Sequence, residues 1–441
     1  MKTNKTQHKH PKIVKWSQPK DQEAMASFLN RPAFDAKAEA VAREVLEDVR
    51  TRGDQAVVQY ARKYDGGSMT IAQMTVTREE RNLASESVDL SFKRSAAETC
   101  ARVARFSRTG MRKDWTMASP KGGVLGETFV PLSRVGAYIP AGAAPLASTA
   151  LMTVALARVA GVPEIVACTP ADPSGRIDPY LLYALEVAGA TEVYRVGGIQ
   201  SIGAMAYGTS TIRKVQKIVG PGGPYVTAAK RLVYGIVDLD LVAGPSEIAV
   251  LADDSAVAAH VAADLLSQAE HGTGHEKALL VTPSMRLAES VREELCRQME
   301  TLSRKEAIRK VLEKGALIVV VDTLDTGMEL CNRFAPEHME IMTHESRKWA
   351  QKVKSAGAVF VGPWTPECAG DFVAGPSHVL PTGGTAAFFS GLTVDSFRKR
   401  ISLIALTRAD LREMLPVIED FGRVEQLDAH SRSARIRFEE K

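Results

Sequence analysis

Short apolar runs alternate with helical segments through the middle of the 441-residue chain, and no other feature constrains its fold as strongly. The apolar runs include 135–140, 164–169 and 247–252, and each is followed by a stretch with the periodicity of a helix. Strands that alternate with helices at this spacing form βαβ units and parallel sheets. The sequence therefore predicts an α/β fold with two doubly wound, Rossmann-like domains.

The regions that flank these residues do not show the alternation of strands and helices. We expect a disordered Lys-rich arm at 1–20 and a mainly helical N-terminal segment at 21–130. Two Rossmann-like domains would follow, the first at 131–245 and the second at 246–390, and a small C-terminal helical tail would occupy 391–441. Residues 362–391 are rich in glycine and proline and show little periodicity. A loop of this length in a compact domain is usually functional.

Charge and cysteine content exclude several classes of function. Six of the 56 basic residues lie in the arm, which leaves 50 against 52 acidic residues elsewhere and no basic surface for nucleic acid. The five cysteines form no C-x-x-C pair, as expected of reduced thiols in the cytoplasm. The chain shows neither a secretory signal nor an apolar stretch long enough to span a bilayer. We expect a cytoplasmic protein without nucleic-acid or membrane partners.

The stretch LLSQAEHG at 265–272 closes an apolar run with helical spacing. Gln268 and His271 are three residues apart and would project from one face of a helix, which Gly272 would then end. Two such side chains can hold a metal ion. Taken alone, however, they are better explained as a polar helix end whose His is favoured by the helix dipole.

Two other stretches carry residues suited to acid–base chemistry. Glu337 and His338 follow a proline and would supply two groups with different pKa values at one place. Asp371 and His378 lie in the long glycine-rich loop, where packing explains such side chains poorly. Each pair also has an ordinary explanation as exposed polar residues, so neither identifies a site alone.

A fourth stretch, EQLDAH, lies near the C-terminus. Its Glu425 and His430 are five residues apart and would not share a helix face, which favours an exposed helix end. Considered with the earlier stretches, His430 nevertheless completes a set of nitrogen and oxygen ligands with Gln268, His271 and Asp371. Such a set suits Zn²⁺ or Mn²⁺ and differs from a structural cysteine-based zinc site.

Nucleotide binding is expected of doubly wound domains, but the chain contains neither G-x-G-x-x-G nor a Walker A sequence. Glycine-rich turns at 197–200 and 220–224 follow predicted strands and open predicted helices. Glycine in such turns lets a phosphate approach the amides of a helix N-terminus. A tight turn needs glycine for its own reasons, so both explanations stay open.

Many stretches of the chain match, in one order, the motifs of a single family. They are GDQAVVQYARKYD (53–65), VGAYIPAG (135–142), VGGIQSIGAMAYGT (196–209), KIVGPG (217–222), AGPSEIAVLAD (243–253), DLLSQAEHG (264–272), NRFAPEHME (332–340), AGDFVAGPSHVLPTGGTA (369–386) and EQLDAH (425–430). On these motifs the chain resembles the histidinol dehydrogenase family over nearly its whole length, residues 41–437. So many long motifs in one order are highly specific.

The resemblance implies an enzyme of amino-acid biosynthesis. Its activity would be the oxidation of L-histidinol to L-histidine, the last step of histidine biosynthesis, through a bound aldehyde. The resemblance implies one Zn²⁺ per subunit and the reduction of two NAD⁺ in succession. It also implies a homodimer in which the C-terminal segment of one subunit completes the active site of the other.

The resemblance assigns roles to individual residues. It places zinc ligands at Gln268, His271, Asp371 and His430, and a catalytic pair at Glu337 and His338. It places substrate contacts at Ser246, His338, His378 and Glu425, in addition to the four zinc ligands. It places NAD contacts at Tyr138, Gln200 and the position of Gly223.

The chain departs from the family pattern at two positions. The family usually has Asn where this chain has Gly223 and Ser377. Loss of the amide at position 223 is expected to weaken or reorient NAD unless the backbone takes over its role. The predicted metal ligands and catalytic pair are unaffected.

Two other functions stay open from the sequence. The first is a paralogue that oxidises another polar alcohol, such as a sulfonated diol, against which Glu425 and the Pro-Ser-Glu motif at 245–247 weigh. The second is a metal-dependent binding or scaffold protein that has lost catalysis. The Glu337–His338 pair weighs against that alternative.

Overall fold

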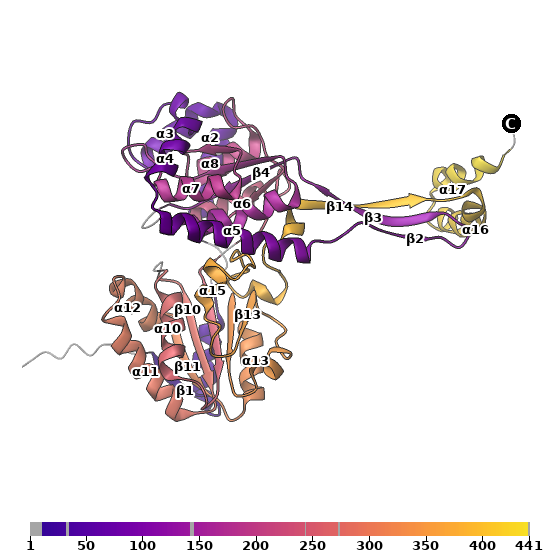
Figure 1. Cartoon of the computed structure of the whole chain (residues 1–441). Coiled ribbons are helices and arrows are strands. Elements are labelled where there is room, and N and C mark those ends of the chain that lie inside the picture. The colour runs from indigo at the N-terminus through magenta and orange to yellow at the C-terminus, as the bar shows by residue number, and fades with distance from the viewer. Residues whose placement is uncertain (1–10, 32–34, 142–144, 243, 272–273, 440–441) are drawn as a thin grey trace, which may run out of the picture.

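A computed structural model gives the structure of residues 11–31, 35–141, 145–242, 244–271 and 274–439. These residues form two α/β domains and an extended arm (Figure 1). Each domain has a parallel sheet between two layers of helices, which confirms the predicted pair of doubly wound domains. No helix in the described part of the chain is long and apolar enough to cross a membrane.

The first domain is built on a five-stranded parallel sheet. Its strands, in the spatial order β6-β5-β4-β7-β8, are β4 (Arg134–Tyr138), β5 (Glu164–Cys168), β6 (Glu192–Tyr194), β7 (Lys217–Val219) and β8 (Asp238–Leu239). Within this sheet the chain runs from β4 through β5 to β6 at one edge. It then returns to form β7 and β8 on the other side of β4. Doubly wound sheets bind ligands where this winding reverses, which here is between the carboxyl ends of β4 and β7.

Helices from the N-terminal part of the chain help to cover both faces of this sheet. One layer comprises α4 (Arg78–Ser87), α5 (Leu90–Gly110), α6 (Ala147–Ala160) and α7 (Pro179–Ala188), and the other α2 (Ala36–Arg52), α3 (Asp54–Tyr64), α8 (Gly198–Tyr207) and α9 (Pro224–Val233). The expected boundary at residue 130 is therefore wrong, because α2 to α5 belong to the first domain's core.

The second domain repeats this winding around β9. Its strands, in the order β1-β11-β10-β9-β12-β13, are β1 (Lys12–Lys15), β9 (Glu247–Ala252), β10 (Lys277–Thr282), β11 (Ala316–Val320), β12 (His338–Met342) and β13 (Ala358–Val361). One helix layer comprises α10 (Ala258–Ala269), α11 (Met285–Met299) and α12 (Lys305–Lys314), and the other α1 (Pro19–Leu29), α13 (Leu324–Phe334) and α14 (Ser346–Ala350). Every residue of β9 and β12 is buried, as is typical of strands covered on both faces.

Residues 12–20 of the predicted disordered arm are ordered. β1 pairs in parallel with β11, with Lys12 opposite Leu317 and Lys15 opposite Val320. The two lysines of the strand are exposed, whereas Val14 is buried in the core. The prediction of disorder is wrong for these residues. Edge strands commonly carry charged side chains, and the lysines of this short strand made it resemble a disordered segment.

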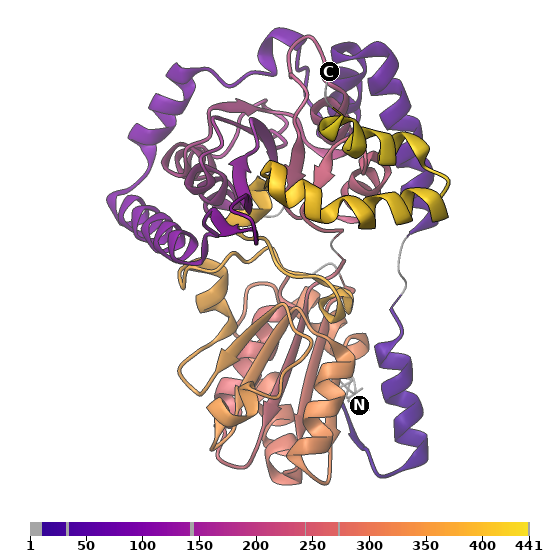
Figure 2. The same cartoon turned by 90° about the vertical axis from the view of Figure 1, so that its right-hand side faces the viewer.

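The extended arm is formed by segments that are far apart in the sequence. β2 (Trp115–Ala118), β3 (Val124–Pro131) and β14 (Arg398–Ala405) pair antiparallel in the order β14-β3-β2. α16 (Arg408–Val424) and α17 (Asp428–Arg435) pack together at the arm's far end, which faces the viewer in Figure 2. The helical tail is confirmed, but the sequence does not predict these strands, because they bury little on either face.

Residues 362–391 contact both domains. They contain α15 (Glu367–Phe372) and the 3₁₀ turn η2 (Thr385–Ala387), and η3 (Val394–Phe397) follows them. Ser377 Oγ donates a hydrogen bond to the carbonyl of Met152 in the first domain. Thr99 Oγ1, also in the first domain, donates to the carbonyl of Phe372. This glycine-rich stretch thus lies between the domains.

Candidate active site

Half of the twelve predicted site residues gather at one edge of the second sheet. The gathered residues are Gln268, His271, Glu337, His338, Asp371 and His378. β12 begins at His338, and α10 runs back against the strands so that its C-terminal end reaches the same edge. The site therefore lies at the amino ends of the strands, whereas doubly wound sheets ordinarily bind ligands at the carboxyl ends.

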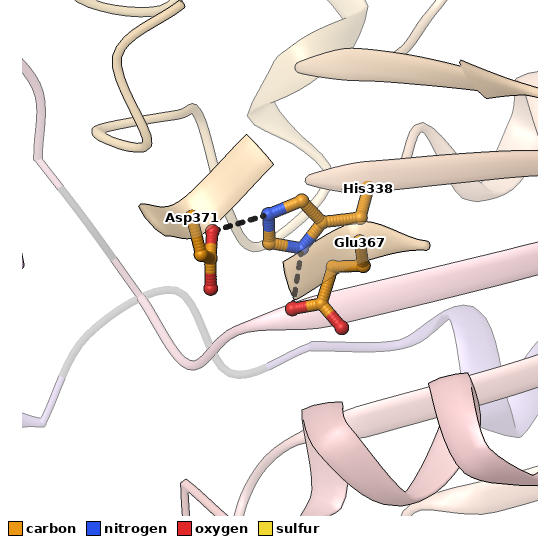
Figure 3. A group of neighbouring side chains, drawn as sticks. All are labelled: His338, Glu367 and Asp371. Atoms are coloured by element: carbon orange, nitrogen blue, oxygen red, sulfur yellow. Dashed lines mark ion pairs between the residues drawn. The ribbon is translucent and has the colours of Figure 1, made fainter. Parts of the chain in front are cut away.

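His338 lies at the centre of this group and is 2% exposed. Its Nδ1 is 2.9 Å from Oε1 of Gln268, and its Nε2 is 3.6 Å from Oδ1 of Asp371. Two further carboxylates face Nδ1, with Oε1 of Glu367 at 3.8 Å and Oε2 of Glu337 at 3.9 Å. Figure 3 shows the imidazole between Asp371 and Glu367. The ring is therefore held between hydrogen-bonding and charged groups on several sides.

Burial and charge shift the pKa values of these groups strongly. Burial disfavours the imidazolium of His338, but Glu337, Asp371 and Glu367 outweigh it and raise its pKa to about 10. Burial raises the pKa of Glu337, and it raises the pKa of Glu367 to about 7. Burial lowers the pKa of His378. The site thus combines basic and acidic groups whose protonation differs from that in water, which is typical of acid–base catalysis.

The Glu337 carboxylate is held by the first residue of β9. Its Oε2 accepts a hydrogen bond of 3.1 Å from the backbone N–H of Glu247. Two residues separate Glu337 from the end of α13. Ala335 has a left-handed φ of 46°, and Pro336 cannot continue the helix. Ser246, a predicted substrate contact, precedes Glu247 at the same edge and is half-buried. The local turn therefore places the Glu337 carboxylate beside Ser246.

Three of the predicted metal ligands come together from α10 and α15. Nε2 of Gln268 lies 3.4 Å from Nδ1 of His271, and the imidazole of His338 contacts both Gln268 and Asp371. The donors are an amide, an imidazole and a carboxylate, which fit Zn²⁺ with positions left open. α10 ends at Ala269, and the predicted end residue Gly272 lies outside the described residues.

His378 and His338 each present an unused nitrogen. Nδ1 of His378 lies 3.0 Å from the carbonyl oxygen of Asp371. Nε2 of His378 and Nε2 of His338 are buried without a hydrogen-bond partner among the described residues. Buried polar atoms ordinarily have partners, so these two nitrogens fit a site that receives a polar ligand.

Glu367 belongs to this group, although the sequence did not single it out. The ligand atoms of His338, Glu367 and Asp371 lie within 4.8 Å of one another. Oε2 of Glu367 also accepts a hydrogen bond from Ser267 Oγ. The available signal was the spacing of Glu367 and Asp371, which are four residues apart and lie on one face of α15.

Glu425 and His430 are not brought to this site within one chain. Glu425 follows α16 and His430 lies on α17, so both belong to the far end of the arm (Figure 1). Both residues are exposed. The arm thus carries the last predicted zinc ligand and one predicted substrate contact away from their own chain's site.

The predicted NAD contacts lie in the first domain near the switch point. Tyr138 ends β4, Gly223 precedes α9, and Gln200 lies in the first turn of α8. Gln200 is fully buried, and neither its Oε1 nor its Nε2 has a hydrogen-bond partner among the described residues. Burial raises the pKa of Tyr138 to about 12, so its hydroxyl is protonated at neutral pH. These features fit a polar ligand at the carboxyl edge of the first sheet.

Ser377 has a structural explanation. It is buried, its Oγ donates to the carbonyl of Met152, and the same Oγ accepts from the N–H of Val379 at 3.2 Å. The hydroxyl at this departure from the family pattern therefore holds the loop beside His378.

Comparison with known proteins gives consistent results. A family model described as histidinol dehydrogenase matches residues 29–438. The histidinol dehydrogenase of Heliobacterium mobile is 43% identical over 92% of this chain and 95% of its own length. That of Moorella thermoacetica is 45% identical over 90% and 93%. The crystal structure of histidinol dehydrogenase from Elizabethkingia anophelis superposes with a TM-score of 0.93 at 33% identity, and covers 98% of both chains.

Proposed function

The chain belongs to the histidinol dehydrogenase family of oxidoreductases, and from this premise we propose that it oxidises L-histidinol to L-histidine with two molecules of NAD⁺. The observation that carries the proposal is the position of Glu337 and His338 beside Gln268, His271 and Asp371. An acid–base pair and a set of metal donors thus share one edge of the second sheet. The relatives support this function over oxidation of another polar alcohol.

We assign the zinc site to Gln268, His271 and Asp371 of one chain, with His430 as the remaining ligand. When bound, Zn²⁺ supplies a positive charge that orients the amine and imidazole nitrogens of the substrate. Fixing these groups would place the alcohol carbon near His338, and such positioning contributes much of the rate of an enzymatic reaction. His378 and Ser246 lie where they would hold the remaining polar groups of the substrate.

In the first oxidation, the neutral form of His338 acts as the base. The hydroxyl group gives its proton to Nε2 of His338, the C–O bond becomes a carbonyl, and the carbon loses a hydride. When bound, NAD⁺ supplies the hydride acceptor. The step therefore converts the alcohol and NAD⁺ into the aldehyde, NADH and one proton.

In the second oxidation, Glu337 activates water. Its carboxylate accepts a proton while the water oxygen bonds to the aldehyde carbon, which gives the singly deprotonated hydrate of the aldehyde. This hydrate then loses a hydride from carbon and a proton from oxygen, with His338 again accepting the proton. The overall step consumes water and a second NAD⁺ and yields the carboxylate, NADH and protons. Residues 362–391 lie where they would retain the aldehyde between the steps.

We place NAD at the switch point of the first sheet, with Tyr138, Gln200 and the backbone at Gly223. The unpartnered amide of buried Gln200 and the open space at Gly223 support this assignment. None of the described cysteines forms a disulfide, which accords with the reducing cytoplasm, where we place the enzyme.

We also propose that two chains exchange their arms. The end of the arm exposes large apolar side chains, with Val417, Phe421 and Val424 each more than half exposed. Apolar surface of this kind favours burial against another protein surface. A second copy of the chain would cover it and would supply Glu425 and His430 to the site described above.

The decisive experiment supplies L-histidinol and NAD⁺ to the purified protein, identifies the product, and counts NADH per product. Two NADH per histidine are expected. Reduction of NAD⁺ with a sulfonated diol but not with L-histidinol would overturn the proposal. The Glu337→Gln variant is the control, because it should still form the aldehyde but should lose most of the second step.

A further inference from the structure

A buried ion pair joins the N-terminal part of the chain to the first residue of β9. Nε of Arg31 lies 2.5 Å from Oε1 of Glu247, and the two side chains are 14% and 2% exposed. Neither oxidation step uses either residue. Replacing a buried ion pair with apolar residues is often neutral for stability, so stability alone gives a poor account of this pair.

Glu247 contacts two parts of the active site. Its backbone N–H donates to Oε2 of Glu337 at 3.1 Å. Its side-chain Oε2 accepts from the N–H of Gly384, in the glycine-rich stretch, at 3.2 Å. Lys277 also acts electrostatically on the Glu247 carboxylate. One buried residue therefore links the carboxylate that activates water to the loop between the domains.

Arg31 contacts the segment that leads to Glu337. Its Nη2 donates to the carbonyl of Phe334 at 2.8 Å, and its guanidinium lies 4.3 Å from the centre of the Phe334 ring. Phe334 is the last residue of α13, three residues before Glu337. The segment is thus held by Arg31 at its start and by the Glu247 amide at its end. Since Arg31 and Glu247 are themselves paired, these contacts form a closed ring.

Gly384 packs directly against this ring. A Cβ atom at this position would collide with Nη1 of Arg31, and its φ of 77° is a conformation that other residues rarely adopt. Gly244 N–H also donates to Thr382 Oγ1, two residues before Gly384. The loop is therefore fixed where it passes the ion pair, so the ring also sets the position of the loop.

We infer that Arg31 and Glu247 are positioning residues that fix the Glu337 carboxylate for the second oxidation. The inference rests on the proposed function, because it assigns the activation of water to Glu337. Arg31 acts through the Phe334 carbonyl and Glu247 through its amide, so neither touches substrate. Displacing a catalytic group by about 1 Å can cost about a hundredfold in rate. Loss of the pair should therefore slow aldehyde oxidation more than alcohol oxidation.

The test compares Arg31→Gln and Arg31→Lys in the full-length enzyme. The initial rates with L-histidinol and with supplied L-histidinaldehyde are measured separately, together with the melting temperature. For Arg31→Gln, we expect kcat with the aldehyde to fall between about tenfold and a hundredfold, while aldehyde formation from L-histidinol changes much less. Arg31→Lys should restore part of the lost rate, because it keeps a cation beside Glu247.

Arg81→Gln is a matched control. Arg81 also pairs with one carboxylate, Glu186 at 3.0 Å, and reaches one carbonyl, that of Ala190 at 3.4 Å, but it lies in the first domain. It should leave the ratio of the two rates unchanged. Equal loss of both rates in Arg31→Gln and Arg31→Lys, or the same change of ratio in Arg81→Gln, would overturn the inference. Absence of wild-type turnover with L-histidinol would instead overturn the proposed function.

Discussion

Nδ1 of His338 lies 2.9 Å from Oε1 of Gln268. An amide oxygen can only accept a hydrogen bond, so this contact assigns the proton of a neutral imidazole to Nδ1. In this neutral form Nε2 carries the lone pair; it lies 3.6 Å from Oδ1 of Asp371 and has no hydrogen-bond partner in the described part of the chain. The contact between two residues 70 positions apart therefore determines which nitrogen of His338 can act as a base.

Replacing His338 should abolish most of the turnover without removing the metal. His338→Gln keeps a polar side chain but lacks a nitrogen that can accept a proton, so kcat should fall by about 10² to 10⁴. Rates of NADH formation and zinc content per chain are the measurements. His344→Gln changes an exposed histidine beyond the other end of β12 and should leave both unchanged. Unaltered turnover in His338→Gln would show that another group is the base.

Chelation should remove activity and leave most of the secondary structure. The parallel sheet of each domain is covered by helices on both faces and has its own core, so neither core depends on a metal. NADH formation and far-UV circular dichroism, followed before and after addition of Zn²⁺, test this. Asp371→Asn keeps the shape of a ligand but loses its charge, and should need more Zn²⁺ for the same activity. Unfolding on chelation would instead indicate a structural metal.

The buried strands were the most predictable part of the fold. β9 occupies the predicted residues 247–252, and β5 lies within the predicted run 164–169, because a strand covered by the core on both faces has a continuous apolar pattern. β3 and β14 give no such signal, since they pair across more than 260 positions, seven of the eight residues of β14 are exposed, and only two of the eight residues of β3 are buried. Their pairing depends on partners that local patterns do not reveal.

The residues of the site were easier to predict than their arrangement. Motifs identified Gln268 and His338, but no local pattern indicated that one would set the tautomer of the other. Nor did the sequence indicate that the site lies at the amino edge of the second sheet. That position follows from the direction of α10 and from the turn before β12, and the ring around Arg31 likewise depends on tertiary contacts.

Gly223→Asn should lower the KM for NAD⁺. Nothing lies within 4 Å of a Cβ built at Gly223, its backbone has ordinary negative φ, and it caps α9 without a side-chain hydrogen bond. The new amide could therefore reach a ligand at the switch point without displacing neighbours. Gly223→Ser would also cap the helix but lacks an amide, so it separates helix stabilisation from NAD binding. An unchanged KM in Gly223→Asn would mean that the backbone already suffices.

Glu192→Gln should make the stability of the protein less dependent on acidic pH. Arg134 holds Glu192 with contacts of 2.6 and 2.7 Å, and mainly for this reason the pKa of Glu192 is lowered to about 2. A lowered pKa in the folded state stabilises above the unfolded pKa of about 4.5, and this contribution is lost as the pH falls towards about 2. Urea unfolding across that window should show a shallower fall for the variant. Glu289→Gln, at an exposed position on α11, is the control and should retain the wild-type slope.

Exchange of arms predicts that two inactive variants restore activity when co-expressed. A chain with His430→Ala keeps its own His338, and a chain with His338→Gln keeps its own His430. In a mixed dimer with exchanged arms, one site has both intact residues and the other has neither. Random pairing makes about half of the dimers mixed, each with one working site, so about a quarter of wild-type activity should return. Because each variant alone should be nearly inactive, an assay of the separately purified proteins gives the baseline. If the co-expressed variants show no more activity than this baseline, His430 does not serve the partner's site.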